Sequence, residues 1–256
     1  MSARLEDAGD RLIIWNGNTE KRGALSPELY ATILDACERA SDPRIRAIIL
    51  TSEGPFFCAG GDLTVLIARQ GMEEADRRAG IEKLHDVVRA MRNCPVPIIA
   101  AVEGGAAGAG LSFALACDIV VAAKGAKFVA AYVKAGLVPD GGLTAHLARA
   151  VPRQLSMEMC LLGQTVFAEK MFDLGVVNAL TDVGGTMDVA RGYADRLAAG
   201  PRVAQGMIRG MVAAAYDQTE AQQLDTERDA MGFATGAPEA GEGIAAFLEK
   251  RPPNYG

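Results

Sequence analysis

Three segments rich in isoleucine, valine and alanine constrain the fold of this 256-residue chain more than any other feature. They span residues 45–51, 98–102 and 119–122. Mostly apolar runs of this length are typical of parallel strands that are buried on both faces of a sheet. Stretches with helical periodicity separate the three segments, which is the pattern of strands joined by crossover helices. The sequence therefore predicts an α/β fold.

Further elements are expected around these strands. Residues 11–16 predict another strand. Ser26 followed by Pro27 predicts the start of a helix, because serine caps helix N-termini and proline fits the first turn. An amphipathic helix is expected over 79–93 and a short buried helix over 111–116.

The last third of the chain has a different character. After about residue 145 the pattern is mostly helical, with helices expected over 147–150, 155–162, 168–174, 189–198, 203–216 and 219–231. A chain of this length suits one large domain, or one domain with an appendage. We predict an α/β core over residues 1–195 and a helical region over residues 196–256.

Composition excludes several classes of function. The formal net charge is −6 and aromatic residues make up 5% of the chain, whereas a dedicated nucleic-acid binder is typically basic and uses aromatic rings to stack bases. No segment approaches the roughly 18 uncharged apolar residues of a membrane-spanning helix. Five widely spaced cysteines without a C-x-x-C pair predict neither a disulfide framework nor a metal site. We expect a cytoplasmic protein that binds neither nucleic acid nor membranes.

Two glycine-rich turns carry the first chemical signal. They span residues 58–63 and 106–111, and each follows a predicted buried strand and precedes a helical pattern. Glycine lets the backbone approach a ligand closely, and a helix N-terminus presents unpaired N–H groups. Either turn alone is more often a structural corner. Together they can form an oxyanion hole, a pair of N–H donors around one carbonyl oxygen.

Asp140 carries the second signal. It lies between Pro139 and two glycines, which is typical of a solvated turn. Its neighbours in the sequence are nonetheless apolar, namely Val133, Ala135, Leu137, Val138 and Leu143. If the carboxylate points into such surroundings, desolvation makes it a usable acid or base. Both interpretations remain open from the residues alone.

The motifs resemble those of the enoyl-CoA hydratase/isomerase (crotonase) superfamily in order and spacing. The segments that carry the resemblance are Lys21 to Ser26, Phe57 to Leu63, the small-residue run that ends at Cys117-Asp118, Ala126 to Phe128, and Gly136 to Gly142. The resemblance covers nearly the whole chain. It implies a spiral core of stacked ββα units, a C-terminal helical trimerisation region, and an acyl-CoA thioester as substrate, with no other cofactor. It also implies a homotrimer or a dimer of trimers.

The resemblance assigns roles to individual residues. The oxyanion donors are the N–H groups of Gly61 and Ala109, with Ala109 at a position that is usually glycine. Asp140 matches the acid/base aspartate of the family's isomerases. The residues expected to contact CoA or the acyl group are Lys21, Arg22, Ala24, Ala59, Gly60, Asp62, Leu63 and Tyr132, together with Phe247 and Lys250 from a neighbouring subunit.

One departure from the family bears on the reaction. Its hydratases hold and ionise a water with two glutamates, and the corresponding positions here are Ser112 and Tyr132. Neutral hydroxyls do not readily take a proton near neutral pH, so ordinary hydration is disfavoured. An aromatic residue at such a position more often packs than reacts, and Ser112 is expected to be a small filler. We expect an acyl-CoA isomerase that moves a double bond or opens an epoxide. The alternatives are a hydratase in which Asp140 activates water and a non-catalytic binder of CoA thioesters.

Overall fold

The predicted buried strands form the centre of a six-stranded sheet in the computed structural model, which describes residues 2–255. The strand order is β1-β2-β3-β4-β6-β9. Strand β1 is antiparallel to β2, and every later pair in this sheet is parallel. The strands are β1 (Ala3–Asp7), β2 (Arg11–Asn16), β3 (Ala47–Ser52), β4 (Ile98–Val102), β6 (Ile119–Ala123) and β9 (Ala179–Thr181). The α/β expectation is confirmed.

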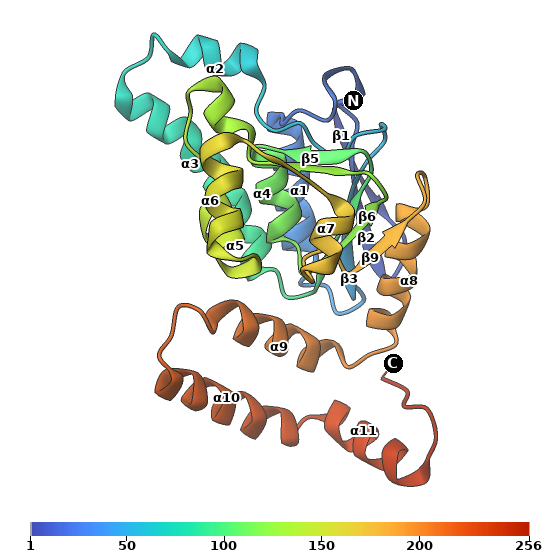
Figure 1. Cartoon of the computed structure of the whole chain (residues 1–256). Helices are drawn as coiled ribbons and strands as arrows, with labels where there is room; N and C mark the ends of the chain where they lie inside the picture. The colour runs from blue at the N-terminus through green and yellow to red at the C-terminus, as the bar shows by residue number, and fades with distance from the viewer. Residues whose placement is uncertain (1, 256) are drawn as a thin grey trace.

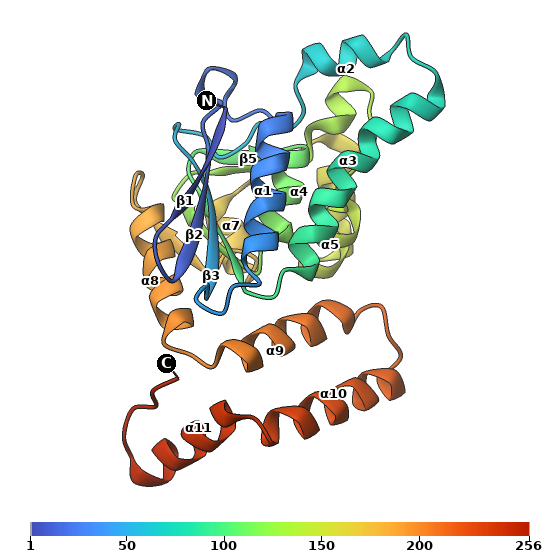
Figure 2. The same ribbon diagram turned by 180° about the vertical axis from the view of Figure 1, so that it is seen from behind.

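The two faces of this sheet are covered by different helices (Figures 1 and 2). On one face, Ile13, Ile49 and Ile99 pack with Ala190 and Ala194 of α8 (Thr186–Ala198). The other face packs against α1 (Pro27–Arg39) and α3 (Glu74–Asn93) in the larger apolar cluster. Because both faces are buried, strands β3 and β4 are apolar almost throughout rather than alternating.

A second, three-stranded sheet is formed by segments that the sequence analysis did not identify as strands. It consists of β5 (Gly105–Ala107), β7 (Lys127–Val129) and β8 (Thr165–Phe167). Strand β5 is parallel to β7, and β7 is antiparallel to β8. Strand β5 leads directly into α4 (Ala109–Ala116), whose residues are nearly all buried. This sheet therefore holds the second glycine-rich turn in place.

The expected helices are present with shifted ends. Ser26 caps α1, its side chain accepting a hydrogen bond from the Leu29 N–H at 3.2 Å. Helix α3 begins at Glu74, five residues before the expected start at residue 79. The remaining helices before the C-terminal region are α2 (Leu63–Arg69), α5 (Leu143–Ala150), α6 (Arg153–Leu162) and α7 (Ala168–Asp173), with short 3₁₀ segments η1 (Thr19–Lys21) and η2 (Ala131–Ala135).

The last helices, α9 (Arg202–Ala214), α10 (Glu220–Thr235) and α11 (Pro238–Glu249), lie apart from the sheets in both views (Figures 1 and 2). Of their residues, only Ala246 is buried in the described chain. The exposed large apolar side chains include Ile208, Val212, Leu224, Met231, Phe233, Ile244, Phe247 and Leu248. We call α9–α11 the C-terminal arm. The division at residues 195 and 196 stays a prediction, and α8 continues to Ala198 on the face of the main sheet.

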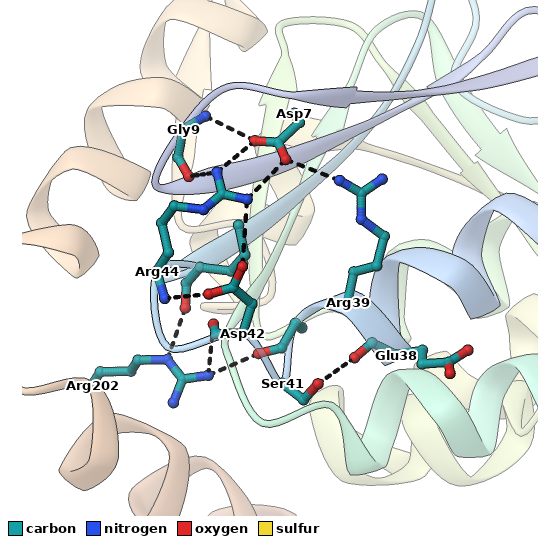
Figure 3. A network of polar contacts seen from close by, with 10 residues as sticks. Asp7, Gly9, Glu38, Arg39, Ser41, Asp42, Arg44 and Arg202 are labelled. Carbon is teal, nitrogen blue, oxygen red and sulfur yellow. Dashed lines mark hydrogen bonds and ion pairs between the residues drawn. The ribbon is translucent and has the colours of Figure 1, made fainter.

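Two arginines attach the arm to the core. Arg202 donates to the carbonyl oxygens of Ala40 and Ile45, each at 2.8 Å, as Figure 3 shows in part. Arg209 donates to the carbonyl oxygens of Arg92 and Cys94, each at 2.7 Å, and pairs with Asp118. The Arg209 side chain is 7% exposed. Charge-assisted hydrogen bonds thus link α9 to the core.

The loops that Arg202 contacts are braced by a second network (Figure 3). Arg44 lies between Asp7 and Asp42, with its closest contact to Asp7 at 2.8 Å. Arg39 also pairs with Asp7. The hydrogen bond from Arg44 holds the pKa of Asp7 well below its usual range.

Candidate active site

The two glycine-rich turns lie against each other. Cys58 and Ala106 form an isolated parallel bridge, and the Ala107 N–H donates to the Cys58 oxygen at 2.9 Å. At Gly60, which has φ of +91°, an added Cβ would lie 2.6 Å from the Ala107 oxygen. At Gly110 it would clash with the Cys58 carbonyl oxygen and lie 2.7 Å from Cys58 Sγ. Glycine is therefore required at both positions because backbone from one turn fills the space beside the other.

This packing brings together the two N–H groups predicted as oxyanion donors. Ala109 is the first residue of α4, so its N–H has no partner within the helix. A Cβ on Gly60 would lie 3.2 Å from the Ala109 nitrogen, which places Gly61 in the adjoining backbone. Within residues 2–255, neither the Gly61 nor the Ala109 N–H donates a hydrogen bond.

Two hydroxyl groups hold Asp140, one at its carboxylate and one at its main-chain carbonyl. The Tyr132 hydroxyl donates to Asp140 Oδ1 at 2.7 Å. Ser112 Oγ donates to the Asp140 carbonyl oxygen at 3.0 Å and lies 3.4 Å from the Tyr132 hydroxyl. Asp140 Oδ2 accepts no hydrogen bond from the described part of the chain. One carboxylate oxygen is thus fixed and the other is open.

The surroundings of Asp140 are partly exposed and partly buried. Of its apolar neighbours in sequence, Leu143 is buried, but Leu137 is 41% and Val138 82% exposed. Leu137 and Val138 therefore do not enclose the carboxylate. Asp140 is half-buried because it contacts Tyr132 and the fully buried Ser112. The sequence pattern identified the residue but not its partners.

Two tyrosines near Asp140 stay protonated. Burial, followed by the negative charge of Asp140, raises the pKa of Tyr132 far above its usual value. The same two causes raise the pKa of Tyr30 to about 12. Tyr30 was not identified from the sequence, where it is one of several residues on an amphipathic helix. Its ring meets Phe113 edge to face, and its hydroxyl has no hydrogen bond within the described residues.

The predicted CoA-contacting loop lies beside the first glycine-rich turn. Lys21 Nζ pairs with Asp62 Oδ2 at 2.6 Å, and this ion pair lowers the pKa of Asp62. The Ala59 N–H donates to the Arg22 oxygen at 3.0 Å, and the Leu25 N–H donates to the Gly60 oxygen at 2.8 Å. Ala24 lies within this hydrogen-bonded loop and is buried.

A small pocket opens next to this loop. It has a volume of about 180 Å³ and is lined by Thr19, Arg22, Gly54, Pro55 and Phe56. The Arg22 guanidinium lies over the Phe56 ring, 4.3 Å from its centroid. This stacking holds a positive charge in the lining of the pocket.

Three further predicted residues are exposed or lie outside the loop and the two turns. Leu63, at the start of α2, is 63% exposed. Phe247 is 83% exposed on α11, and Lys250 follows that helix. Helix α11 lies at the opposite end of the molecule from α2 (Figures 1 and 2). The expectation that Phe247 and Lys250 reach CoA from a neighbouring subunit stays a prediction.

Among the described residues, no cluster of histidine, cysteine or acidic side chains could hold a metal ion, and no helix there is long and apolar enough to cross a membrane.

Comparison with known proteins gives the family. Residues 16–256 match the family model described as enoyl-CoA hydratase/isomerase. The chain belongs to the enoyl-CoA hydratase/isomerase family. It is 36% identical to the 1,2-epoxyphenylacetyl-CoA isomerase of Escherichia coli, over 92% of this chain and 91% of that protein. It is 34% identical to a probable enoyl-CoA hydratase of Rhodobacter capsulatus, over 98% and 96% of the two chains.

Solved structures confirm the crotonase fold. The crystal structure of an enoyl-CoA hydratase from Polaromonas sp. JS666 matches with a TM-score of 0.96 and 42% identity, covering 99% of each chain. The expected family and fold are therefore confirmed. The names of these enoyl-CoA hydratase/isomerase relatives include both an isomerase and hydratases. Membership of the family therefore does not distinguish isomerisation from hydration.

Proposed function

We propose that this family member is an acyl-CoA isomerase that moves a double bond or opens an epoxide ring, with Asp140 as the acid/base. The observation that carries the proposal is the single carboxylate of Asp140, fixed by Tyr132 at 2.7 Å and open at Oδ2. The positions at which the family's hydratases have glutamates hold Ser112 and Tyr132 instead. An isomerase needs one group that takes a proton and returns it, since no proton is consumed overall.

The N–H groups of Gly61 and Ala109 are proposed to bind the thioester oxygen. Asp140 Oδ2 takes a proton from the acyl carbon and the C–H bond breaks. The electron pair of that bond moves toward the thioester oxygen. Two N–H donors stabilise the resulting enolate, and one such donor is typically worth about 3 kcal/mol. Protonated Asp140 then returns the proton to a different carbon. The free N–H groups at the packed glycine turns support this role.

The proposed binding mode places CoA along the loop of Lys21, Arg22 and Ala24. The ammonium of Lys21 and the guanidinium of Arg22 offer positive charge to phosphate groups. Ala59, Gly60, Asp62 and Leu63 line the path toward Gly61. The hydrogen bonds between this loop and the first glycine-rich turn support a single continuous path.

The Asp140→Asn variant tests the assignment. It preserves the shape of the side chain and removes the base. Wild type and variant are compared on a panel of 2-enoyl, 3-enoyl and epoxide acyl-CoA thioesters, with substrate loss and product followed by mass spectrometry. We expect isomerised products from wild type and a loss of kcat of at least about 1000-fold in the variant. A variant as active as wild type removes Asp140 from the mechanism, and tight binding without turnover by wild type favours a non-catalytic binder.

A hydratase is the second candidate, favoured by the name of the Rhodobacter capsulatus relative. In that reaction Asp140 activates a water, and the product is a hydroxyacyl-CoA. Incubation of a 2-enoyl-CoA in heavy-oxygen water separates the two reactions, because hydration alone adds the label as a new hydroxyl group.

The proposed oligomer is a homotrimer or a dimer of trimers, assembled through the C-terminal arm. The exposed apolar side chains of α9–α11 support this proposal, since isolated domains rarely expose so many. Light scattering coupled to size-exclusion chromatography measures the assembly. A monomeric species at micromolar concentration contradicts it.

A further inference from the structure

We propose that Tyr132 is a positioning residue for the proton transfer assigned to Asp140, an inference that rests on the proposed function. The hydroxyl of Tyr132 donates to Asp140 Oδ1 at 2.7 Å, a separation typical of a good O–H···O hydrogen bond. Sequence reasoning favours a packing role for an aromatic residue here, but packing requires the ring and not the hydroxyl.

The ring of Tyr132 also lies close to the second glycine-rich turn. Tyr132 lies in η2, and a Cβ on Gly108 would lie 3.9 Å from Cε2 and Cζ of the ring. Gly108 caps α4 and precedes Ala109. One side chain therefore contacts the proposed base and lies beside the backbone that carries a proposed oxyanion donor. This arrangement fixes the position of the carboxylate relative to the enolate that it forms.

Ser112 completes the arrangement from the other side. Its hydroxyl donates to the Asp140 carbonyl oxygen at 3.0 Å, so the backbone as well as the side chain of Asp140 is held. Ser112 is fully buried within α4. Since Oδ1 is occupied by Tyr132, the open Oδ2 is the oxygen that meets the substrate.

The direction of the hydrogen bond follows from the electrostatics. Burial and the charge of Asp140 keep Tyr132 protonated at any pH at which an enzyme of this kind is assayed. Tyr132 therefore donates, and Asp140 Oδ1 accepts. Tyr132 does not exchange the proton itself, because its hydroxyl is already committed to Asp140.

The test compares two variants that each remove one hydroxyl near Asp140. Tyr132→Phe removes the hydrogen-bonded hydroxyl and keeps the ring. Tyr30→Phe is the matched control, because the Tyr30 hydroxyl is also close enough to sense the charge of Asp140 but makes no hydrogen bond in the described chain. Conversion of a 3-enoyl-CoA into its conjugated isomer gives kcat and KM, and thermal unfolding reports the fold.

We expect Tyr132→Phe to lower kcat about 10- to 100-fold, the effect of one hydrogen bond to a charged group. KM should stay within about twofold and the melting temperature within about 2 °C. Tyr30→Phe should retain the wild-type kcat. An unchanged kcat in Tyr132→Phe overturns the inference, and so does a loss that appears in KM and melting temperature instead.

The inference and the proposed function can fail separately. If Asp140→Asn is inactive while Tyr132→Phe matches wild type, the base assignment survives and the positioning role is wrong. If Asp140→Asn is as active as wild type, the proposed function itself is wrong. Where Asp140→Asn retains measurable activity, adding Tyr132→Phe should cost no further activity, because the two residues act as one unit.

Discussion

The ammonium of Lys21 lies 2.6 Å from the carboxylate of Asp62 and joins the loop after β2 to the N-cap of α2. Asp62 also accepts a hydrogen bond from the Thr64 N–H at 2.9 Å. The Lys21 side chain remains 56% exposed. Its charge is thus held in place at the edge of the proposed CoA path and still faces solvent.

Lys21→Ala should weaken thioester binding with little effect on the chemical step. We expect KM for an acyl-CoA to rise about three- to tenfold and kcat to stay within about twofold, because a contact to phosphate is made equally in the ground and transition states. Steady-state kinetics at low and high salt measures the effect. Lys124→Ala is the control, since Lys124 forms a similar exposed pair with Asp182 away from the loop. Equal changes in both variants contradict the assignment.

Gly110→Ala should destabilise the protein even though alanine favours helices. The new Cβ meets Cys58 Sγ at 2.7 Å and forces the two glycine-rich turns apart. We expect a loss of about 1–3 kcal/mol in the free energy of unfolding, typical of overpacking. Gly192→Ala in α8 is the matched control, because nothing lies within 4 Å of its added Cβ. That variant should gain about 0.5–1 kcal/mol in denaturant titrations. Similar values for the two variants contradict the close packing of the turns.

Arg209→Ala should loosen the C-terminal arm. It leaves Asp118 without its ion pair and removes hydrogen bonds to main-chain carbonyls. We expect the free energy of unfolding to fall by about 2–4 kcal/mol and amide exchange in α9 to accelerate. Arg228→Ala on α10 removes only exposed pairs and should cost less than about 1 kcal/mol. If amides of α9 in Arg209→Ala exchange as slowly as in wild type, Arg209 does not anchor the helix.

His146 should make stability depend on pH. Burial, followed by the nearby charges of Arg92 and Arg149, lowers the pKa of His146 to about 4, whereas an unfolded histidine titrates near 6.5. The folded state therefore favours the neutral ring. The contribution of neutral His146 to the free energy of unfolding is complete above about pH 6.5 and is lost as the pH falls toward 4.

The measurement is the change in unfolding free energy between pH 7.5 and pH 5. His146→Gln should lose about 1–2 kcal/mol less than wild type over this interval. His85→Gln serves as the control for a histidine that lies near the surface, with its side chain 34% exposed. If the wild type and His146→Gln lose the same free energy, the ring is not held neutral in the folded protein.

The central strands could be predicted from sequence because their side chains are buried on both faces. Strand β4 was located with its observed ends, and β6 was placed one residue short. Strands β5, β7, β8 and β9 have only three residues each. Segments this short show no periodicity, and their pairing depends on partners far along the chain. The first residues of α3 are polar, so the apolar pattern of that helix gave no sign of its start at Glu74.

The candidate site was predictable to a similar extent. The glycines at positions 60 and 110 were noticed because of their residue type, and the structure gives the physical reason, which is the close approach of two backbones. The contact between Tyr132 and Asp140 could not be predicted, because it depends on how η2 and the following loop turn back on themselves. The exposure of Val138 could not be predicted either, because it also depends on the course of this loop.

Helix α9 is fastened to the core mainly through carbonyl oxygens of the backbone, at Ala40, Ile45, Arg92 and Cys94. Every residue type supplies such an oxygen, so substitutions at these four positions leave the anchoring atoms in place as long as the loops keep their course. Side-chain identity on the core side still matters at Asp118, which pairs with Arg209, and at Arg92, whose guanidinium donates to the Ala213 oxygen of α9. Elsewhere the docking of the helix depends on Arg202 and Arg209.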